Sequence, residues 1–485
     1  MKVKKEIIFG IFSLLFTFLV LFSLQFSSNI ILGYDGYYHI KMAELIKDRG
    51  LVREFPWTQY SLHNENFADL HLGYHLLLLP FTLFSMRLGM KLAILSFSFA
   101  LFAVFFYVLN KEKAKKAYLW IIVLLFSSYP VLLRANLGKL DMLSMIFFLG
   151  IVLALFNKKY YYTLLFSYLF TITYSFSIVL LLFASVFFFL EYAYNKKWDF
   201  KALFPAAGYF LGLLLNPYFQ DNLKLLWIQI FQIGFTKPVA AANEWQPLMP
   251  GEYLLYNIIV LFLLGAILYM LFSKKTAADK RKAFLLVFSF ISLTAGAFSR
   301  RFIVFAPIFI VWLAALCFGE AKIKPAVRRA ALIFILMLAA ANGAYSYYRV
   351  KSDINKFDIP YGIYETSQWL MLNTEEGSVV FTDEWWYFPI LFYYNSHNYY
   401  LYGFEGNFGY AYDAELYNNW LAIVNGKAEN PYGVIKEKFS AEYVLTSEKD
   451  GFYNILSKSA DFEKVFEQDR FAVFKVRSFQ MIIQN

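Results

Sequence analysis

The chain has 485 residues, of which 59% are hydrophobic and 21% aromatic, and it carries a formal net charge of +10. Soluble domains are roughly 45–50% apolar, so this composition excludes an ordinary soluble protein. The recurring apolar runs of about 20 residues indicate membrane-spanning helices, since the strands of a membrane barrel are shorter and alternate. The basic residues cluster in short loops, as in cytoplasmic loops of membrane proteins, and we therefore expect no nucleic-acid partner.

The first predicted span covers residues 7–32, and the basic residues before it place the N-terminus in the cytoplasm. Residues 33–90 then follow on the extracytoplasmic side. Within them, the apolar stretch 75–84 is too short to cross a membrane and contains Pro80, so we expect an interfacial or re-entrant helix. With ten further spans the total is eleven, and these ten are expected near residues 91–110, 118–136, 142–156, 161–175, 177–192, 203–219, 253–272, 283–298, 302–318 and 330–347.

From Tyr348 onward polar and charged residues become frequent and no further span follows. Residues 361–372 have the pattern of a helix, whereas 377–385, 441–449 and 471–476 have that of strands. We therefore predict a polytopic α-helical membrane domain over residues 1–347 and a soluble α/β domain over residues 348–485. The odd number of spans places this second domain on the extracytoplasmic side of the cell membrane.

The predicted topology brings ionisable side chains to the extracytoplasmic ends of the helices. Taken singly, each has an ordinary explanation, such as a helix N-cap for Asp35 and Asp141 or a headgroup anchor for the arginines. Their occurrence on one side of the membrane favours a functional site, because charge near hydrocarbon is costly. Carboxylates and imidazoles can bind a divalent cation, and arginines can bind phosphate. The residues are Asp35, His39, Asp69, His71, His75, Asp141, Glu244, Arg300 and Arg301.

Five short segments resemble, in the right order, motifs of the catalytic subunit of oligosaccharyltransferases, in the GT-C superfamily of membrane glycosyltransferases. They are "DGYYH" (35–39), "RANLGKLD" (134–141), "NEWQP" (243–247), "AGAFSRRFIVFAP" (295–307) and "DEWWYFP" (383–389).

The resemblance implies a role for individual residues. Asp35 corresponds to the metal-binding, catalytic Asp, Asp141 to the first acid of the second motif, and Glu244 to the loop glutamate of the site. The spacing to the following proline assigns the lipid phosphate to Arg300, with Arg301 beside it. The two tryptophans of the last motif, Trp385 and Trp386, correspond to acceptor-binding residues.

Two departures from the family pattern affect the metal site and the acceptor. Leu143 stands where the second motif carries another acid, so Asp69 or His71 could complete the metal site; His39 is a further candidate. Tyr387 stands where the family has the Asp that binds the Ser or Thr of the acceptor sequon. The acceptor, a protein or a glycan, therefore stays open.

The resemblance implies transfer of a sugar or oligosaccharide from a polyprenyl-(pyro)phosphate donor in the bilayer, as in protein glycosylation, with Mn or Mg as cofactor. The metal would neutralise the departing phosphate, and Asp35 would orient or deprotonate the acceptor. A related possibility is a GT-C transferase that uses a polyprenyl-monophosphate sugar to modify a lipid, glycan or protein hydroxyl. Outside the enzymes, a transporter or flippase predicts charges near the midplane and internal repeats, and a non-catalytic scaffold would use its Asp and Glu residues as helix caps.

Overall fold

The computed structural model describes residues 2–236, 239, 242–357, 362–447 and 451–477. The chain forms two compact units, which are described separately. The helical unit comprises Met1–Gly33, Leu70–Pro217 and Ala242–Phe357. The mixed unit comprises Tyr34–Asp69, Tyr218–Ala241 and Asp358–Asn485. The predicted domain boundary at 347/348 falls inside a continuous helix, α16, and the mixed unit recruits two earlier stretches of the chain as well.

Each predicted span of the helical unit coincides with a helix, or in one place with two. Within the described residues, six helices are long and apolar enough to cross a membrane, among them α1, α5, α13 and α16, and the other apolar helices are shorter. The protein is therefore a multi-pass helical membrane protein, and the count of eleven spans stays a prediction. The main helices of this unit are α1 (Lys2–Gln25), α5 (Met86–Lys111), α6 (Ala117–Leu125), α7 (Tyr129–Arg134), α8 (Asp141–Phe156), α9 (Tyr160–Thr173), α10 (Val179–Asn195), α11 (Phe204–Leu214), α13 (Pro250–Phe272), α14 (Lys280–Phe298), α15 (Phe305–Glu320) and α16 (Pro325–Lys356).

Two spans differ from their predicted bounds for local reasons. The first helix ends at Gln25 rather than near residue 32, and the exit loop ends at Gly33, whose φ of +83° suits a residue without a Cβ. The span predicted over 118–136 is broken between α6 and α7. Pro130 at the start of α7 lacks a backbone N–H, and the Ser128 hydroxyl caps the new helix by accepting from the Val131 N–H at 3.4 Å.

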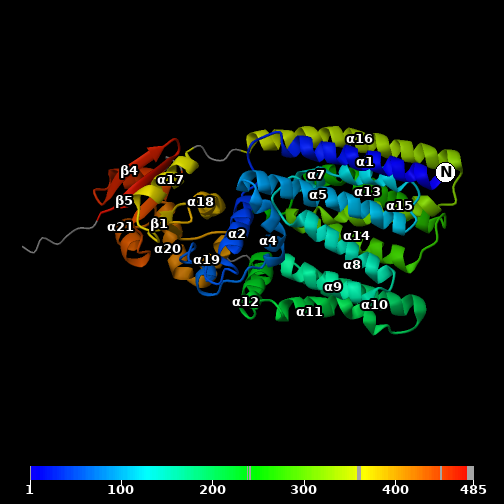
Figure 1. The fold of residues 1–485 in the computed structure, drawn as a ribbon, viewed down its shortest axis with the longest axis horizontal. Coiled ribbons are helices and arrows are strands. Elements are labelled where there is room, and N and C mark those ends of the chain that lie inside the picture. Colours follow the sequence, from blue (N-terminus) through cyan, green and yellow to red (C-terminus); the bar gives the residue numbers. More distant parts are fainter. Residues whose placement is uncertain (1, 237–238, 240–241, 358–361, 448–450, 478–485) are drawn as a thin grey trace, which may run out of the picture. The chain divides into compact units, whose positions relative to one another are not determined.

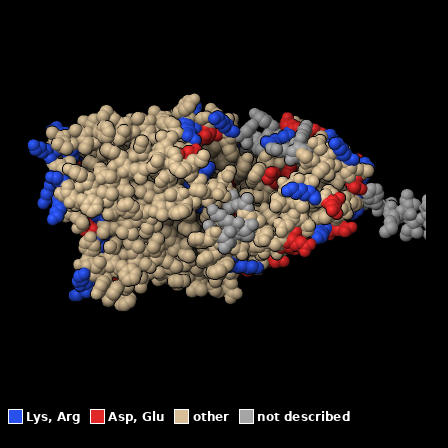
Figure 2. Space-filling view, turned by 180° about the vertical axis from the view of Figure 1, so that it is seen from behind, with Lys and Arg blue, Asp and Glu red and all other residues tan. Residues whose placement is uncertain are grey.

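Burial separates the core of the helical unit from its surface. In α15 89% of the most apolar window is buried, whereas the corresponding value for α1 and for α16 is 22%. A helix that is apolar all round and buried all round forms a core, and α15 has this role. Figure 1 shows α1 and α16 side by side, and Figure 2 shows a broad flank without charged residues beside an end rich in Lys and Arg.

Small residues allow α11 to approach α9 closely. A Cβ at Gly208 would lie 2.6 Å from the Leu164 carbonyl oxygen, and one at Gly212 would lie 2.5 Å from the Thr171 side chain. The spacing of these two glycines is the small-xxx-small pattern of membrane helix pairs. The predicted short helix over 75–84 is present as α4 (Leu72–Leu78) followed by the 3₁₀ turn η1 (Leu79–Leu83).

A five-stranded sheet organises the mixed unit. Its strand order is β2-β1-β3-β5-β4, with parallel pairing of β1 to β2 and β3 and antiparallel pairing of β5 to β3 and β4. The predicted helix over 361–372 and the three predicted strands are confirmed. They are α17 (Ile363–Asn373), β1 (Val379–Thr382), β3 (Tyr443–Thr446) and β5 (Phe471–Val476), joined by β2 (Tyr399–Tyr400) and β4 (Phe462–Gln468).

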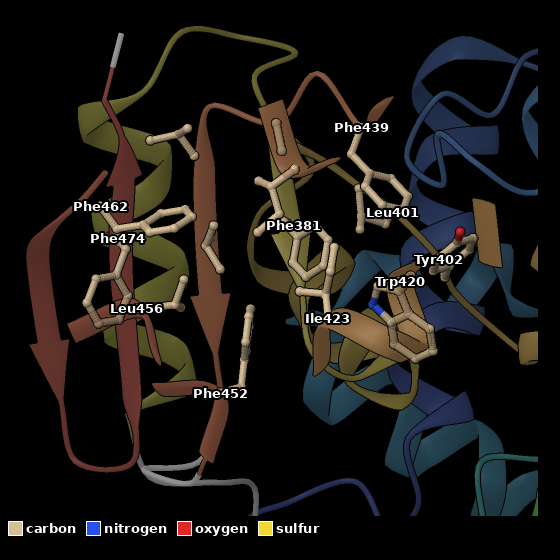
Figure 3. Packing of buried hydrophobic residues seen from close by; sticks show 14 of the residues in the cluster. Phe381, Leu401, Tyr402, Trp420, Ile423, Phe439, Phe452, Leu456, Phe462 and Phe474 are labelled. Carbon is tan, nitrogen blue, oxygen red and sulfur yellow. The ribbon is translucent and has the colours of Figure 1, made fainter. Parts of the chain in front are cut away.

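Helices cover both faces of this sheet. On one face Phe381 and Phe474 pack with residues of α20 (Ala414–Val424) and α22 (Gly451–Lys458), as Figure 3 shows. On the other face Trp369 of α17 stacks on Phe466 with the ring centroids 5.5 Å apart. Strands β1, β3 and β5 are buried on both faces for this reason, which explains why they read as short, nearly continuous apolar runs, whereas the edge strand β4 is largely exposed.

Residues 34–69, the first part of the loop predicted over 33–90, belong to the mixed unit. Its helix α2 (Asp35–Arg49) packs on α18 (Phe388–Tyr394), where the rings of Tyr37 and Tyr393 lie edge to face at 5.1 Å. Residues 57–60 extend the sheet beyond β2 through backbone hydrogen bonds to Tyr400 and Leu401. Shorter elements complete this unit: α3 (Leu62–Glu65), α12 (Asp221–Trp227), η3 (Ile228–Thr236), η6 (Trp385–Tyr387), α19 (Gly406–Tyr412), α21 (Pro431–Gly433) and η7 (Val434–Lys438).

Candidate functional site

A cluster of five charged side chains lies in the helical unit around Glu244. This residue sits on the one-turn helix η4 (Asn243–Trp245) in the loop before α13. Its Oε2 is 2.6 Å from Lys139 Nζ and 3.7 Å from Arg134 Nη1, and its Oε1 is 3.0 Å from Arg301 Nη1. Three cations from distant parts of the chain therefore converge on one carboxylate.

Asp141 is the second carboxylate of this cluster. It is the first residue of α8, and its Oδ2 accepts a hydrogen bond of 2.9 Å from Arg134 Nη1. The N-cap position belongs to Leu140, so the ordinary capping explanation does not describe Asp141. The Arg134 and Asp141 side chains are only 9% and 4% exposed, so this pair is shielded from water and from screening by salt.

Arg301, rather than Arg300, points into the cluster. The two arginines begin the 3₁₀ turn η5 (Arg300–Phe302) after α14. The Arg301 guanidinium lies over the Trp245 ring at 4.9 Å and near the Tyr174 ring at 6.0 Å. Arg300 instead donates from its backbone N–H to the Gln246 carbonyl at 3.0 Å and from Nε to the Pro247 carbonyl at 3.4 Å.

Backbone contacts hold these two loops in register. The Ser299 hydroxyl donates to the Glu244 carbonyl oxygen at 2.9 Å and accepts from the Arg301 N–H. Together with the bond from Arg300 to Gln246, this contact fixes the segment 299–301 against the segment 244–247. The direction in which each arginine points is therefore set by the loop pairing rather than by a continuous helix.

Three cations surround the Glu244 carboxylate. Burial by itself would raise the pKa of the Glu244 carboxyl, but Lys139, Arg301 and Arg134 together hold that pKa well below its ordinary range. Glu244 is therefore ionised. Two of the cations around it are arginines, whose guanidinium groups can donate bidentately to the oxygens of a phosphate.

Asp141 Oδ2 accepts a hydrogen bond from Arg134, and both oxygens of Glu244 lie beside cations. The metal-binding role expected for these two acids stays a prediction. Among the described residues, no three His, Cys, Asp or Glu side chains come close enough to hold a metal ion together. The other two acids that we expect at the metal, Asp35 and Asp69, belong to the mixed unit.

The mixed unit holds the remaining extracytoplasmic candidates of the first loop. Asp35 is the first residue of α2, half-buried, after Tyr34 at the N-cap position, and His39 is buried one turn further along. Asp69 is 2% exposed and lies near Tyr38. Burial, with the Asp69 charge as a second cause, raises the pKa of the Tyr38 phenol well above its ordinary value.

The tryptophan pair lies in the same unit as Asp35. Trp385 and Trp386 form the turn η6 with their rings 6.1 Å apart, and Trp386 is 45% exposed whereas Trp385 packs against the core. Tyr387 is buried, with its ring 6.3 Å from Tyr34 and 5.7 Å from Phe471. The segment predicted to meet the acceptor therefore lies next to the start of the helix that carries Asp35.

The two histidines of the first loop that follow Asp69 belong to the helical unit. His71 is the N-cap residue of α4, and His75 is buried within that helix. The structure thus divides the sequence candidates into two groups. Asp141, Glu244, Arg300, Arg301, His71 and His75 lie in the helical unit, whereas Asp35, His39, Asp69, Trp385 and Trp386 lie in the mixed unit.

Sequence reasoning missed Arg134 and Lys139 as members of the site. Both occur in the stretch around residues 134–141, in which the acid Asp141 is the conspicuous residue. A signal was present, because basic residues are depleted in extracytoplasmic loops and these two lie at a predicted extracytoplasmic helix end.

No model of a known protein family matches the chain, and no curated protein matches it either. Solved structures do. The chain aligns over 91% of its length with the archaeal oligosaccharyltransferase AglB from Archaeoglobus fulgidus, in complex with an inhibitory peptide and a dolichol-phosphate, at a TM-score of 0.65 and 14% identity, covering 69% of that chain.

Two further structures are similar. ArnT from Cupriavidus metallidurans in the apo state matches at a TM-score of 0.60 and 11% identity, covering 95% of this chain and 97% of that one. The arabinofuranosyltransferase AftD from Mycobacteria matches at a TM-score of 0.60 and 12% identity, covering 97% of this chain and 40% of that one.

The fold is that of the GT-C glycosyltransferases. The predicted superfamily architecture, a polytopic helical domain with a small C-terminal α/β region, is therefore confirmed. At 11–14% identity these similarities show the fold, and the activity has to be argued from the site.

Proposed function

We propose that this protein is a membrane glycosyltransferase that takes its sugar from a polyprenyl-linked phosphate donor in the bilayer. The observation that carries the proposal is the convergence of Arg134, Lys139 and Arg301, all at least partly buried, on the Glu244 carboxylate. Two similar structures support this ligand class, since AglB holds a dolichol-phosphate and a second ArnT structure, with a TM-score of 0.58, is bound to undecaprenyl phosphate.

In the proposed reaction Arg301 and Lys139 bind oxygens of the donor phosphate, and Glu244 holds both cations in place. The bond between the anomeric carbon and the phosphate oxygen breaks, and the negative charge left on the phosphate is stabilised by cations already in position. Asp35 orients the acceptor nucleophile or removes its proton.

A divalent metal, Mn or Mg, stays part of the proposal through Asp35 and Asp69. Hard cations prefer carboxylate oxygens, and a bound metal would supply further stabilisation of the leaving phosphate. Asp141 and Glu244 orient the cations of the cluster.

Two classes of donor and acceptor fit the proposal. The first is oligosaccharyltransferase-like, with a pyrophosphate-linked oligosaccharide and an Asn acceptor. The second uses a monophosphate-linked sugar and a hydroxyl on a lipid, glycan or protein. One observation favours the second class: Tyr387 is 7% exposed where an acceptor-binding Asp would be expected.

The test is a transfer assay on purified protein in detergent or nanodiscs. A polyprenyl-pyrophosphate oligosaccharide with a sequon peptide is compared with a polyprenyl-monophosphate sugar and lipid or glycan acceptors. Asp35→Ala should lower the chemical rate by about 10²-fold or more, of order ~3 kcal/mol, and a chelator should lower activity until Mn or Mg is restored. Full activity of Asp35→Ala rejects the catalytic role, and full activity in chelator rejects the metal.

The orientation of the protein in the membrane is part of the same proposal. The loop charges place the N-terminus in the cytoplasm and the C-terminal residues outside. Protease added to intact cells should therefore cleave within residues 362–477, and protection of this region until lysis would reverse the orientation.

A further inference from the structure

The long helix α16 carries an arginine at a place where the mechanism above has no use for one. In this helix only 22% of the most apolar window is buried, so most of its surface would face lipid. Between Pro325 and Arg349 the helix rises by about 36 Å, which exceeds the ~30 Å of hydrocarbon in a bilayer. The sequence around Arg349 is "YSYYRVK", an aromatic group followed by basic residues, as is typical of a membrane–water interface. Arg349 therefore lies at headgroup level.

Tyrosines hold the Arg349 side chain in one position. Its guanidinium lies over the ring of Tyr129, at 4.9 Å, and over the ring of Tyr256, at 5.2 Å. Its Nη1 donates to the Tyr345 hydroxyl at 2.7 Å. Tyr129 and Tyr256 are 9% and 5% exposed and come from α7 and α13, so the arginine rests on a rigid aromatic surface.

The positive charge of Arg349 is not neutralised by a contact. Among the residues that the structure describes, no carboxylate oxygen lies within 4.0 Å of its guanidinium. The nearest acid along the helix, Asp353, accepts a hydrogen bond from the Tyr129 hydroxyl instead. Arg349 is also half-buried rather than enclosed, and its hydrogen bond to Tyr345 uses only Nη1 of the guanidinium.

We propose that Arg349, positioned by Tyr129 and Tyr256, binds the phosphate of an anionic membrane phospholipid. A guanidinium presents two parallel donors to phosphate oxygens, and stacking on aromatic rings fixes the direction of that fork without consuming it. The site is separate from the proposed donor site, because Arg349 contacts none of the charged residues that surround Glu244. Since α7 carries Tyr129 at its start and Arg134 at its end, the bound lipid would stabilise the helix that supplies one cation to the donor cluster.

The experiment measures phospholipid binding directly. The full-length protein in detergent is titrated with phosphatidylglycerol, with phosphatidylcholine and with inorganic phosphate, and bound lipid is counted by native mass spectrometry. We expect preferential binding of phosphatidylglycerol over phosphatidylcholine by the wild type. Arg349→Gln should weaken phosphatidylglycerol binding roughly ten-fold, as expected for the loss of a charge-assisted contact. The affinity of Arg349→Lys for phosphatidylglycerol should lie between those of the wild type and Arg349→Gln, because lysine keeps the positive charge but cannot donate two parallel hydrogen bonds.

A matched control lies on the same helix. Lys351→Gln removes the same charge from an exposed residue two positions away, and it should change phosphatidylglycerol binding less than two-fold, about the size expected for a screened surface charge. If Arg349→Gln and Lys351→Gln weaken phosphatidylglycerol binding equally, the binding depends on general surface charge and the proposal is wrong. If inorganic phosphate binds as tightly as phosphatidylglycerol and displaces it, the site is not specific for a phospholipid.

Two further variants test whether a loss of phosphatidylglycerol binding reflects the lipid site itself rather than misfolding or damage to the donor site. Tyr256→Leu keeps the arginine and removes one ring, so it should weaken phosphatidylglycerol binding while the helical unit still unfolds cooperatively. Arg301→Gln should leave this binding unchanged even where it abolishes transfer, which distinguishes failure of the lipid site from failure of the proposed function. Loss of phosphatidylglycerol binding in Arg301→Gln, or its persistence in Arg349→Gln, would contradict the proposal.

Discussion

Helix α14 has a charged cluster at each end, and the two clusters differ in how their cations and carboxylates are arranged. At its start, three consecutive basic residues each reach a carboxylate on another part of the chain: Lys280 contacts Glu191, Arg281 contacts Glu112 at 2.6 Å, and Lys282 contacts Glu320 at 2.6 Å. Beyond its other end, Arg301 joins two further cations around two carboxylates.

This difference separates a structural from a functional arrangement of charge. At the Lys280 end each of the three basic residues contacts a different carboxylate, and these contacts join separate elements of the helical unit. At the Arg301 end three cations converge on one carboxylate, and two of them are arginines that can donate bidentately. Such a convergence suits an anionic ligand, and four measurements can test or sharpen the contrast.

The largest expected effect is that of Arg301 on donor use. Arg301→Lys keeps the charge but loses the bidentate fork, so the transfer rate at limiting donor should fall about 10²-fold, roughly 3 kcal/mol. Arg300→Lys is the matched control and should change the transfer rate at limiting donor only a few-fold. The rates of both variants are measured in separate titrations of donor and of acceptor. A larger effect at Arg300, as its spacing to Pro307 suggests, would show that the loop reverses the two side chains when donor binds.

The second effect concerns stability and its pH dependence at Glu244. Glu244→Gln removes the negative charge on which Arg134, Lys139 and Arg301 converge and should lower the free energy of unfolding by about 3 kcal/mol at pH 7. The folded-state pKa is lowered, so the carboxylate stabilises the fold above its unfolded pKa of roughly 4.3. The difference between wild type and variant should therefore shrink as the pH falls below that value. Thermal unfolding in detergent at several pH values measures this difference in stability. Glu429→Gln, at an exposed residue, is the control.

The third effect is the counterpart at the Lys280 end. Glu112 is 2% exposed at its side chain, and Glu112→Gln should cost about 2 kcal/mol of stability because the ion pair with Arg281 loses its negative partner. The donor KM should stay within two-fold of the wild type. A rise in donor KM as large as that of Arg301→Lys would show that the paired cluster also serves the ligand.

The smallest effect on stability is expected in the mixed unit. Trp386 is 45% exposed, so Trp386→Ala should change the free energy of unfolding by only about 0.5 kcal/mol. If this ring meets the acceptor, the acceptor KM should still rise several-fold while the donor KM does not. Leu421→Ala, at an exposed residue of α20, is the control. A change in donor KM alone would remove Trp386 from the acceptor site.

Much of the fold could be predicted from the chain because apolar runs and strand patterns are local properties. Every predicted span meets a helix, and α17, β1, β3 and β5 lie where their patterns place them. The break between α6 and α7 was missed although Pro130 is visible in the sequence, because an otherwise apolar run of suitable length outweighed one proline.

The candidate acids could also be found from sequence, since ionisable residues near helix ends are rare and conspicuous. Their partners could not. Lys139 and Glu244 are 105 residues apart along the chain, and nothing in either segment encodes a contact of 2.6 Å. The assignment of the phosphate to Arg300 depends on spacing alone, whereas the structure directs Arg301 toward Glu244.

The sequence by itself determined that this is a helical membrane protein with a polar C-terminal region and a set of charged residues at predicted extracytoplasmic helix ends, because composition and periodicity are properties of contiguous residues. Only the tertiary structure decided which cations meet which acids, and that residues 34–69 form one compact unit with the C-terminal region. The physical reason is the same in both cases: ion pairing and side-chain packing depend on distances through space, and these are fixed only when segments far apart in the chain are brought together.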